Sequence, residues 1–541
     1  MKGFPSILML CCLFPVVLPL ACKRAEPEPV VEPVVDPGEK ALAPPRLREL
    51  DFTPFEEALA SLGKKRLAEI ARLVREGDID SVGAAMAAGE VTSEELTLFF
   101  LDGIRRCDGI LRSTLELNPA ALEEARAADR ERRAGLERGP LHGIPVNLKD
   151  NIGTTAPLHT TAGAEILLDH SPTEDAVLVR RLREAGAVLL GKAALSELAG
   201  ALTTDPPGYN AISGMGRNPY GEQWPVSGSS SGSAVSTSAF LTMASVGTET
   251  SGSLVAPGAK NGVVAMMPGP GVVSTTGLVP LIRFQDSAGP VARSVRDAAR
   301  LLAAMDEEET DYAASLDPAA LEGVAMGVLR RSLLADEGKP DTEFWLARID
   351  EGLQKAGAIP RDLDETFAEK PDLLPLIFLG LSHDTLGYFA EAGSPVRSVA
   401  DLQKYNRADP ERRIPRGQNM IDLAVRVLPV LADDPERTEA DPGPFYEAAA
   451  SEARARAAAL LAAAFSDHDV ELLVSLANAH SDVYATAGYP AITVPLGLDR
   501  EGQPNGVTFI GQPSCEARLL AYAHAFEEAT GYRVPPPDRT E

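Results

Sequence analysis

The chain has 541 residues, of which 45% are hydrophobic, and this content is ample for a packed core. Its formal net charge of −27 at pH 7 argues against partners that are themselves negatively charged, such as nucleic acids and anionic lipid surfaces. A chain of this length has room for two or three domains of average size, although large α/β enzymes often fold as one.

The first 21 residues have the features of a secretory signal peptide. Lys2 precedes an apolar run from Phe4 to Ala21, which ends in a small residue. Cys22 follows directly, and this order is similar to a bacterial lipoprotein signal, in which the cysteine is lipidated and becomes the mature N-terminus. We therefore expect an exported lipoprotein of the bacterial cell envelope, anchored to the membrane through Cys22, with a simple secreted form as the alternative.

Residues 22–48 connect this cysteine to the rest of the chain. Residues 26–37 read Glu-Pro-Glu-Pro-Val-Val-Glu-Pro-Val-Val-Asp-Pro. An acidic, proline-rich segment of this kind cannot bury a core. We expect an extended tether that holds residues 49–541 away from a membrane.

Helices and short apolar strands alternate along the rest of the chain. Thr92 and Glu95 form a capping-box pattern that predicts a helix from residue 93. Further helices are predicted over residues 120–136, 177–185 and 516–529, and strands over residues 187–190, 491–495 and 507–510. This alternation indicates an α/β protein. Residues 319–464 carry helical patterns and proline-containing loops but no chemical motif.

Two glycine-rich tracts with many hydroxyl side chains stand out. Residues 228–234 read Gly-Ser-Ser-Ser-Gly-Ser-Ala, and residues 247–253 read Gly-Thr-Glu-Thr-Ser-Gly-Ser. A single tract of this kind is more often a linker or a surface turn. Apolar segments follow both tracts, however, and irregular backbone embedded in buried structure tends to mark a site.

Lys149 ends an apolar run over residues 143–148 and supplies the chemistry that the serines need. A serine nucleophile requires a base to take its proton. Lysine serves as that base once burial lowers its pKa from about 10.4. The combination predicts acyl transfer by a serine whose base is not histidine.

Competing motifs are weaker. Residues 186–193 approach the phosphate-binding Gly-x4-Gly-Lys-[Ser/Thr] pattern, but Ala193 lacks the hydroxyl that would hold Mg²⁺. Residues 228–232 fit a Gly-x-Ser-x-Gly nucleophile elbow centred on Ser230, and a Ser-His-Asp hydrolase that uses His524 stays an alternative. None of the seven histidines forms a His-x-x-x-His pair, so neither a metal nor another cofactor is expected.

The ordered motifs resemble those of the amidase signature family, serine hydrolases with a Ser–cis-Ser–Lys triad. The resemblance rests on residues 139–151, 228–234, 247–253 and 286–295. Within the family, the two glycine-rich motifs, residues 228–234 and 247–253, are most similar to those of bacterial peptide amidases. It implies that residues 49–541 are one α/β amidase domain with a large mixed, twisted β-sheet covered by helices on both faces.

The resemblance also implies roles for individual residues. Ser253 is the expected nucleophile, Ser229 the bridging serine and Lys149 the base, with a cis peptide bond before Ser229. Lys149 has to be unprotonated, and Asp150 would oppose this unless its side chain points elsewhere.

The expected substrate-binding residues follow from the same motifs. The N–H groups of Thr250, Ser251, Gly252 and Ser253 are expected to form the oxyanion hole, with Ser230 among the substrate-binding residues.

The implied activity is hydrolysis of carboxamide C–N bonds through an acyl-enzyme, with peptide C-terminal amides or small amides as substrates. Ser251 stands where relatives carry Gly or Asp, and Met266-Met267 replaces Leu-Lys. These departures leave an alternative open, in which the chain is a catalytically weak protein with the amidase fold that binds a component of the cell envelope. The glutamine-amide hydrolysing subunit of tRNA-dependent amidotransferases is a further family alternative, which the export signal argues against.

The oligomeric state and a disulfide between Cys107 and Cys515 stay open.

Overall fold

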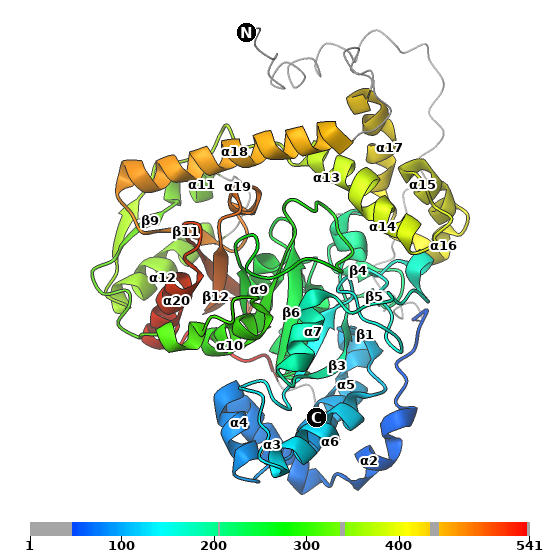
Figure 1. The fold of residues 1–541 in the computed structure, drawn as a ribbon. Helices are drawn as coiled ribbons and strands as arrows, with labels where there is room; N and C mark the ends of the chain where they lie inside the picture. Colours follow the sequence, from blue (N-terminus) through cyan, green and yellow to red (C-terminus); the bar gives the residue numbers. More distant parts are fainter. Residues whose placement is uncertain (1–45, 204–205, 336–340, 433–442, 538–541) are drawn as a thin grey trace. The chain divides into compact units, whose positions relative to one another are not determined.

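The computed structural model describes residues 46–203, 206–335, 341–432 and 443–537 (Figure 1). The predicted signal peptide, Cys22 and the predicted tether up to residue 45 lie outside these residues. Within the described ranges, no helix combines the length and the apolar character that a membrane crossing requires.

A mixed sheet of eleven described strands forms the centre of the domain, in the order β1-β3-β2-β6-β8-β7-β12-β13-β11-β9-β10. The pairs within β3-β2-β6 and within β11-β9-β10 are parallel, and the remaining pairs are antiparallel. The strands are β1 Thr114–Leu117, β2 Pro145–Lys149, β3 Val188–Ala193, β6 Ala244–Glu249, β7 Val264–Met267, β8 Ser287–Ala292, β9 Ala325–Val328, β10 Ile359–Asp362, β11 Leu472–Leu476, β12 Ala491–Leu498 and β13 Pro504–Ile510. A separate two-stranded sheet pairs β4 Tyr209–Asn210 with β5 Gly214–Met215.

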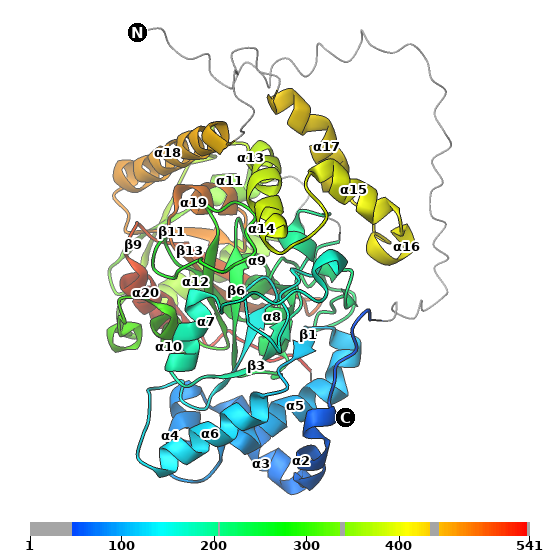
Figure 2. The same cartoon turned by 45° about the vertical axis from the view of Figure 1, so that its right-hand side comes forward.

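Helices surround this sheet, with α18 along one side of the domain and α3 to α6 gathered on the opposite side (Figure 1 and Figure 2). The helices are α2 Glu56–Ser61, α3 Lys64–Glu76, α4 Ile79–Ala87, α5 Ser93–Leu111, α6 Ala121–Arg133, α7 Val177–Glu184, α8 Ser231–Ser238, α9 Val255–Lys260, α10 Val295–Met305, α11 Arg330–Ala335, α12 Thr342–Lys355, α13 Leu374–Gly380, α14 Leu386–Glu391, α15 Val399–Arg407, α16 Pro410–Arg413, α17 Asn419–Ala432, α18 Gly443–His468, α19 Ser481–Ala487 and α20 Glu516–Thr530.

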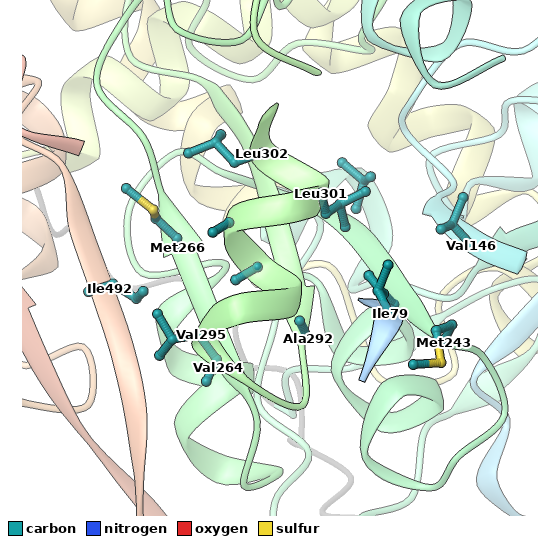
Figure 3. Close-up of a cluster of buried hydrophobic side chains, with 14 of the residues drawn as sticks. Ile79, Val146, Met243, Val264, Met266, Ala292, Val295, Leu301, Leu302 and Ile492 are labelled. Atoms are coloured by element: carbon teal, nitrogen blue, oxygen red, sulfur yellow. The ribbon is translucent and has the colours of Figure 1, made fainter. Parts of the chain in front are cut away.

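Both faces of the sheet are covered, as strand β7 illustrates. Val264 and Met266 pack in the core cluster that includes α10 and α20, whereas Ala265 and Met267 pack in the cluster that includes α9 and α18. Successive side chains of a strand point to opposite faces, so each face has its own apolar layer. Figure 3 shows Val295 and other α10 side chains beside the sheet residues on the first face.

Several predicted elements are confirmed. The helix after Thr92 is α5, and its capping box is complete, because the Thr92 side chain accepts the Glu95 N–H and the Glu95 carboxylate accepts the Thr92 N–H. The predicted helices over residues 120–136, 177–185 and 516–529 correspond to α6, α7 and α20. The predicted strands correspond to β3, β12 and β13, although β13 begins at Pro504, before the start predicted at residue 507.

Residues 319–464 contain helices, as predicted, together with two strands that were not predicted. β9 and β10 have four residues each and extend one edge of the sheet. Helices α13, α14, α15 and α17 share a core cluster with Leu167, Leu281 and Ile282. This helical layer therefore supports the loop before β8, which leads into the site described below.

The two cysteines beyond Cys22 lie in different surroundings. Cys107 is buried in α5, and Cys515 is half-buried next to the start of α20. No disulfide joins these two described cysteines.

Candidate active site

Lys149 lies at the carboxyl end of β2, in the interior of the sheet. β2 is flanked by the parallel strands β3 and β6, and all five of its residues are buried. Strands that are covered on both faces are near-continuously apolar, and in β2 the exceptions are Asn147 and, at its end, Lys149. Its side chain is 0% exposed.

The Lys149 amine has three polar neighbours. Its Nζ lies 2.8 Å from Thr248 Oγ1, 3.1 Å from the Thr248 carbonyl oxygen and 2.7 Å from Ser229 Oγ. A neutral amine has two N–H groups and one lone pair. With the two N–H groups donated to Thr248, the lone pair is left to accept the Ser229 O–H.

Burial lowers the pKa of Lys149 to about 7, and the negative charges of Asp286 and Glu249 partly oppose this shift. Asp150, next to it in sequence, faces the other way. Its Oδ1 lies 3.6 Å from Lys192 Nζ. Its Oδ2 accepts hydrogen bonds from the N–H and the hydroxyl of Thr161. The adjacent carboxylate therefore does not hold Lys149 in its charged form.

Ser229 is presented by an irregular turn at the start of the first glycine-rich tract. The Gly228–Ser229 peptide bond is cis, as the resemblance implied. The Ser229 carbonyl oxygen accepts the Ser196 N–H at 3.0 Å, and the chain then enters α8. Ser229 is 3% exposed, so its hydroxyl meets Lys149 in an almost closed environment.

Ser253 lies in the turn between β6 and α9. Gly252 precedes it with φ +77°, a conformation that favours glycine. The Ser230 N–H donates to the Ser253 carbonyl oxygen at 3.1 Å, which ties the two tracts together. Ser253 is 8% exposed. Within the described residues its hydroxyl makes no hydrogen bond, so the structure joins Lys149 directly to Ser229 but places Ser253 beside them without a hydroxyl–hydroxyl bond.

The turn around Ser253 offers free N–H groups. Across the described part of the chain, the N–H groups of Thr250, Ser251 and Ser253 have no hydrogen-bond acceptor. The Gly252 N–H differs, because it donates to Glu249 Oε1 at 2.7 Å. Of the four N–H groups expected to form the oxyanion hole, that of Gly252 is therefore already taken by the Glu249 carboxylate, and the other three stay expected donors.

The side chains of this turn are also fixed. The Thr250 hydroxyl donates to Asp286 Oδ1 at 2.5 Å. The Ser251 hydroxyl donates to Ser481 Oγ at 3.2 Å, which links the turn to α19. Burial raises the pKa of Asp286 to about 6, and the Thr250 hydroxyl works against that rise.

Ser230 has a supporting position. It is fully buried, and its hydroxyl donates to the Thr248 carbonyl oxygen at 2.9 Å and accepts the Thr248 N–H at 3.2 Å. The histidine of the nucleophile-elbow alternative is elsewhere. His524 lies on α20 with its Nδ1 3.9 Å from Glu527 Oε2. The contacts of Ser230 therefore do not fit the nucleophile of a Ser-His-Asp hydrolase.

One described group of side chains has the make-up of a metal site. His524, Glu527 and Glu528 of α20 place ligand-type atoms within 4.8 Å of one another. Glu527 accepts the Val295 N–H there, just past the carboxyl end of β8. Asp286 precedes the opposite end of β8, so this group is separate from the surroundings of Lys149.

Comparison with known proteins gives a consistent result. The family model described as Amidase matches residues 95–408. A probable amidase of Arabidopsis thaliana is 34% identical over 501 residues, which cover 86% of this chain and 92% of that protein. The chain belongs to the amidase family. It is therefore an amide-hydrolysing enzyme with a single large α/β domain.

Solved structures of amidases match most of the chain. An amidase family protein from Bacillus anthracis has a TM-score of 0.81 and 33% identity, and the match covers 90% of this chain and 97% of that one. The peptide amidase from Stenotrophomonas maltophilia has a TM-score of 0.76 and 38% identity, with 85% and 98% covered. The resemblance to peptide amidases seen in the motifs thus extends to the fold.

Sequence reasoning missed several residues of this amidase site. Thr248 and Glu249 lie inside a motif that was recognised, but no role was given to their side chains. Asn151 donates to Thr248 Oγ1 at 3.0 Å. Tyr484 donates to Glu249 Oε1 at 3.0 Å from α19. Asp286 is the first residue of the motif at residues 286–295, so the sequence could have pointed to it. Tyr484 lies in none of the motifs, so nothing in the sequence indicated its role.

Proposed function

We propose that this amidase cleaves carboxamide C–N bonds through an acyl-enzyme on Ser253. The Ser253 oxygen attacks the amide carbonyl, and its proton passes to Ser229 as the Ser229 proton passes to neutral Lys149. The route then reverses, and the C–N bond breaks as the leaving nitrogen is protonated. Water attacks the acyl-enzyme, releases the carboxylic acid and restores Ser253.

One observation carries this proposal. Lys149 Nζ lies 2.7 Å from Ser229 Oγ, and both side chains are buried. Burial holds the pKa of Lys149 at about 7, so a large share of the lysine is neutral near neutral pH. The three free N–H groups beside Ser253 provide donors for the oxygen that becomes negative in the transition state.

A fluorophosphonate probe, which reacts with activated serines, tests the nucleophile. We expect it to label the wild type and to leave Ser253→Ala unlabelled. Ser230→Ala is the matched control, because Ser230 is a neighbouring serine with a supporting role, and it should still be labelled. Labelling that persists in Ser253→Ala and vanishes in Ser230→Ala would instead favour the nucleophile-elbow alternative.

The proposed substrate is the C-terminal amide of a short peptide. The support is the likeness to the peptide amidase from Stenotrophomonas maltophilia over most of both chains. The proposed export of this protein adds support, because peptides are available outside the cytoplasm. Serine and methionine are uncharged, so neither Ser251, which donates a hydrogen bond to Ser481, nor Met267, which is buried in the core, places a charge at the turn.

Hydrolysis rates on matched substrates test this preference. We expect a dipeptide amide to be cleaved faster than benzamide and faster than the corresponding tripeptide with a free carboxylate. Measured kcat/KM values for the three compounds decide the matter. A higher value for benzamide would assign the chain to general amidases.

The proposal also covers the location of the protein. Lys2, the apolar run and Cys22 support export with a lipid on Cys22, so that the amidase domain acts in the cell envelope.

A further inference from the structure

The Glu249 carboxylate lies at the centre of the turn that carries Ser253. Its Oε1 accepts the Gly252 N–H at 2.7 Å and the Tyr484 hydroxyl at 3.0 Å. Its Oε2 accepts the Leu254 N–H at 2.7 Å and the Val255 N–H at 3.1 Å. The side chain is 1% exposed, so these contacts replace solvent almost completely.

These four donors specify the ionisation state of Glu249. An ionised carboxylate accepts through about four lone-pair positions and donates nothing, whereas a protonated one gives up part of that capacity to its own O–H. Burial raises the pKa of Glu249, and the hydrogen bonds from Leu254, Val255, Gly252 and Tyr484 act against that rise. With each oxygen accepting two hydrogen bonds, the contacts fit the ionised form.

The same contacts determine which N–H groups of the turn stay free. Glu249 takes the N–H groups of Gly252, Leu254 and Val255. Those of Thr250, Ser251 and Ser253 have no acceptor among the described residues. A turn held from one side by a buried carboxylate therefore leaves its other N–H groups for a ligand oxygen.

We propose that Glu249 is a positioning residue of the reaction, whose carboxylate, held by Tyr484, fixes the turn so that three N–H groups face the substrate oxygen. The inference rests on the proposed function and adds a residue to it. Glu249 also places a negative charge near Lys149, together with Asp286. It thus acts on both parts of the site, the oxyanion turn and the base.

Glu249→Gln separates this role from a merely structural one. The amide keeps the size of the side chain but replaces one acceptor oxygen with an NH2 group that faces two donors. We expect kcat to fall by between about tenfold and about 100-fold, since the loss of a whole oxyanion donor costs about 100-fold or more. We expect the acid limb of the pH–rate profile to move to lower pH, because a negative charge near Lys149 is removed.

Two further variants make the test specific. Tyr484→Phe keeps the charge but removes one donor, so we expect a smaller fall in kcat and an unmoved acid limb. Asp297→Asn is the matched control, because Asp297 is a buried carboxylate that accepts the Ile79 N–H at 2.7 Å beyond the other end of β8. It should leave both kcat and the acid limb unchanged.

The outcomes distinguish this inference from the proposed function. Labelling of Ser253→Ala by the fluorophosphonate would overturn the proposed function itself. If only Ser253→Ala loses labelling, while folded Glu249→Gln keeps the wild-type kcat and acid limb, the positioning role fails and the proposed function stands. The inference is also overturned if Glu249→Gln lowers kcat without moving the acid limb and Asp297→Asn lowers kcat by the same factor. If Glu249→Gln does not fold, Tyr484→Phe takes its place in the test. A rate of fluorophosphonate labelling in Tyr484→Phe equal to that of the wild type would then overturn the inference.

Discussion

Lys149 and Lys192 are two fully buried lysines on adjacent strands, and their surroundings differ in one respect. Burial lowers the pKa of both amines. Lys192 has the Asp150 carboxylate at 3.6 Å and also donates to the Ile152 carbonyl oxygen at 2.7 Å. Lys149 has only hydroxyl and carbonyl oxygens at hydrogen-bond distance. Of the two, Lys149 is therefore the amine that is set up to be neutral.

This difference predicts the pH dependence of the reaction. The base has to be unprotonated, so kcat/KM should rise with pH and reach half of its plateau near the Lys149 pKa of about 7. The charged groups that act on Lys149 are Asp286 and Glu249, and both hold this midpoint higher than burial alone would. Steady-state hydrolysis of a peptide amide from about pH 5 to about pH 9 measures it. A rate that is flat across this range would contradict a lysine base.

Lys149→Met is the control for this prediction, with a distinct effect on stability. The variant should be inactive at every pH. In the wild type the folded pKa of Lys149 lies below its unfolded value, so the unfolded chain binds more protons between about pH 7 and about pH 10.4. The free energy of unfolding of the wild type should therefore rise relative to the variant as pH increases through this range, by on the order of 5 kcal/mol. Parallel stability curves would show that Lys149 is not buried with a lowered pKa.

At the scale of elements, strong local signals predicted structure well. The capping box at Thr92, the helix of α20 and the alternation around β12 and β13 are local patterns, and the elements formed where expected. β9 and β10 were missed because each has four residues, and the helical patterns around them dominate the sequence. Their place at the edge of the sheet depends on pairing with β11 and with each other, which no local window contains.

In the site, too, the local motifs were informative, whereas they did not predict the contacts of the Glu249 side chain. The motifs placed Lys149 and Ser229 in one region, and the fold brings them within hydrogen-bond distance. The Gly252 N–H was assigned to the substrate because the motif does not show that Glu249 folds back onto it. Tyr484 is 235 residues away from Glu249 along the chain, so their contact is a product of tertiary packing alone.

At the scale of the whole molecule, charge and anchoring have to be considered together. The whole chain has a net charge of −27, so anionic lipid headgroups repel it. No helix of the described residues is suited to cross a membrane. Attachment of this protein to a membrane through a lipid on Cys22 stays a proposal from the sequence.

A single substitution tests the proposal that Cys22 carries a lipid. Two or more acyl chains on one cysteine anchor a protein firmly, whereas a single chain binds only reversibly. Cys22→Ser removes the acceptor of these chains, and electrostatic attraction offers no substitute, so we expect the protein to move from the membrane fraction to the soluble fraction. Cys515→Ser is the matched control, because Cys515 is a half-buried cysteine of the folded domain and should leave the distribution unchanged. Cell fractionation followed by the peptide-amide assay measures both location and activity. If Cys22→Ser stayed in the membrane fraction after a high-salt wash, the anchor would lie elsewhere in the chain.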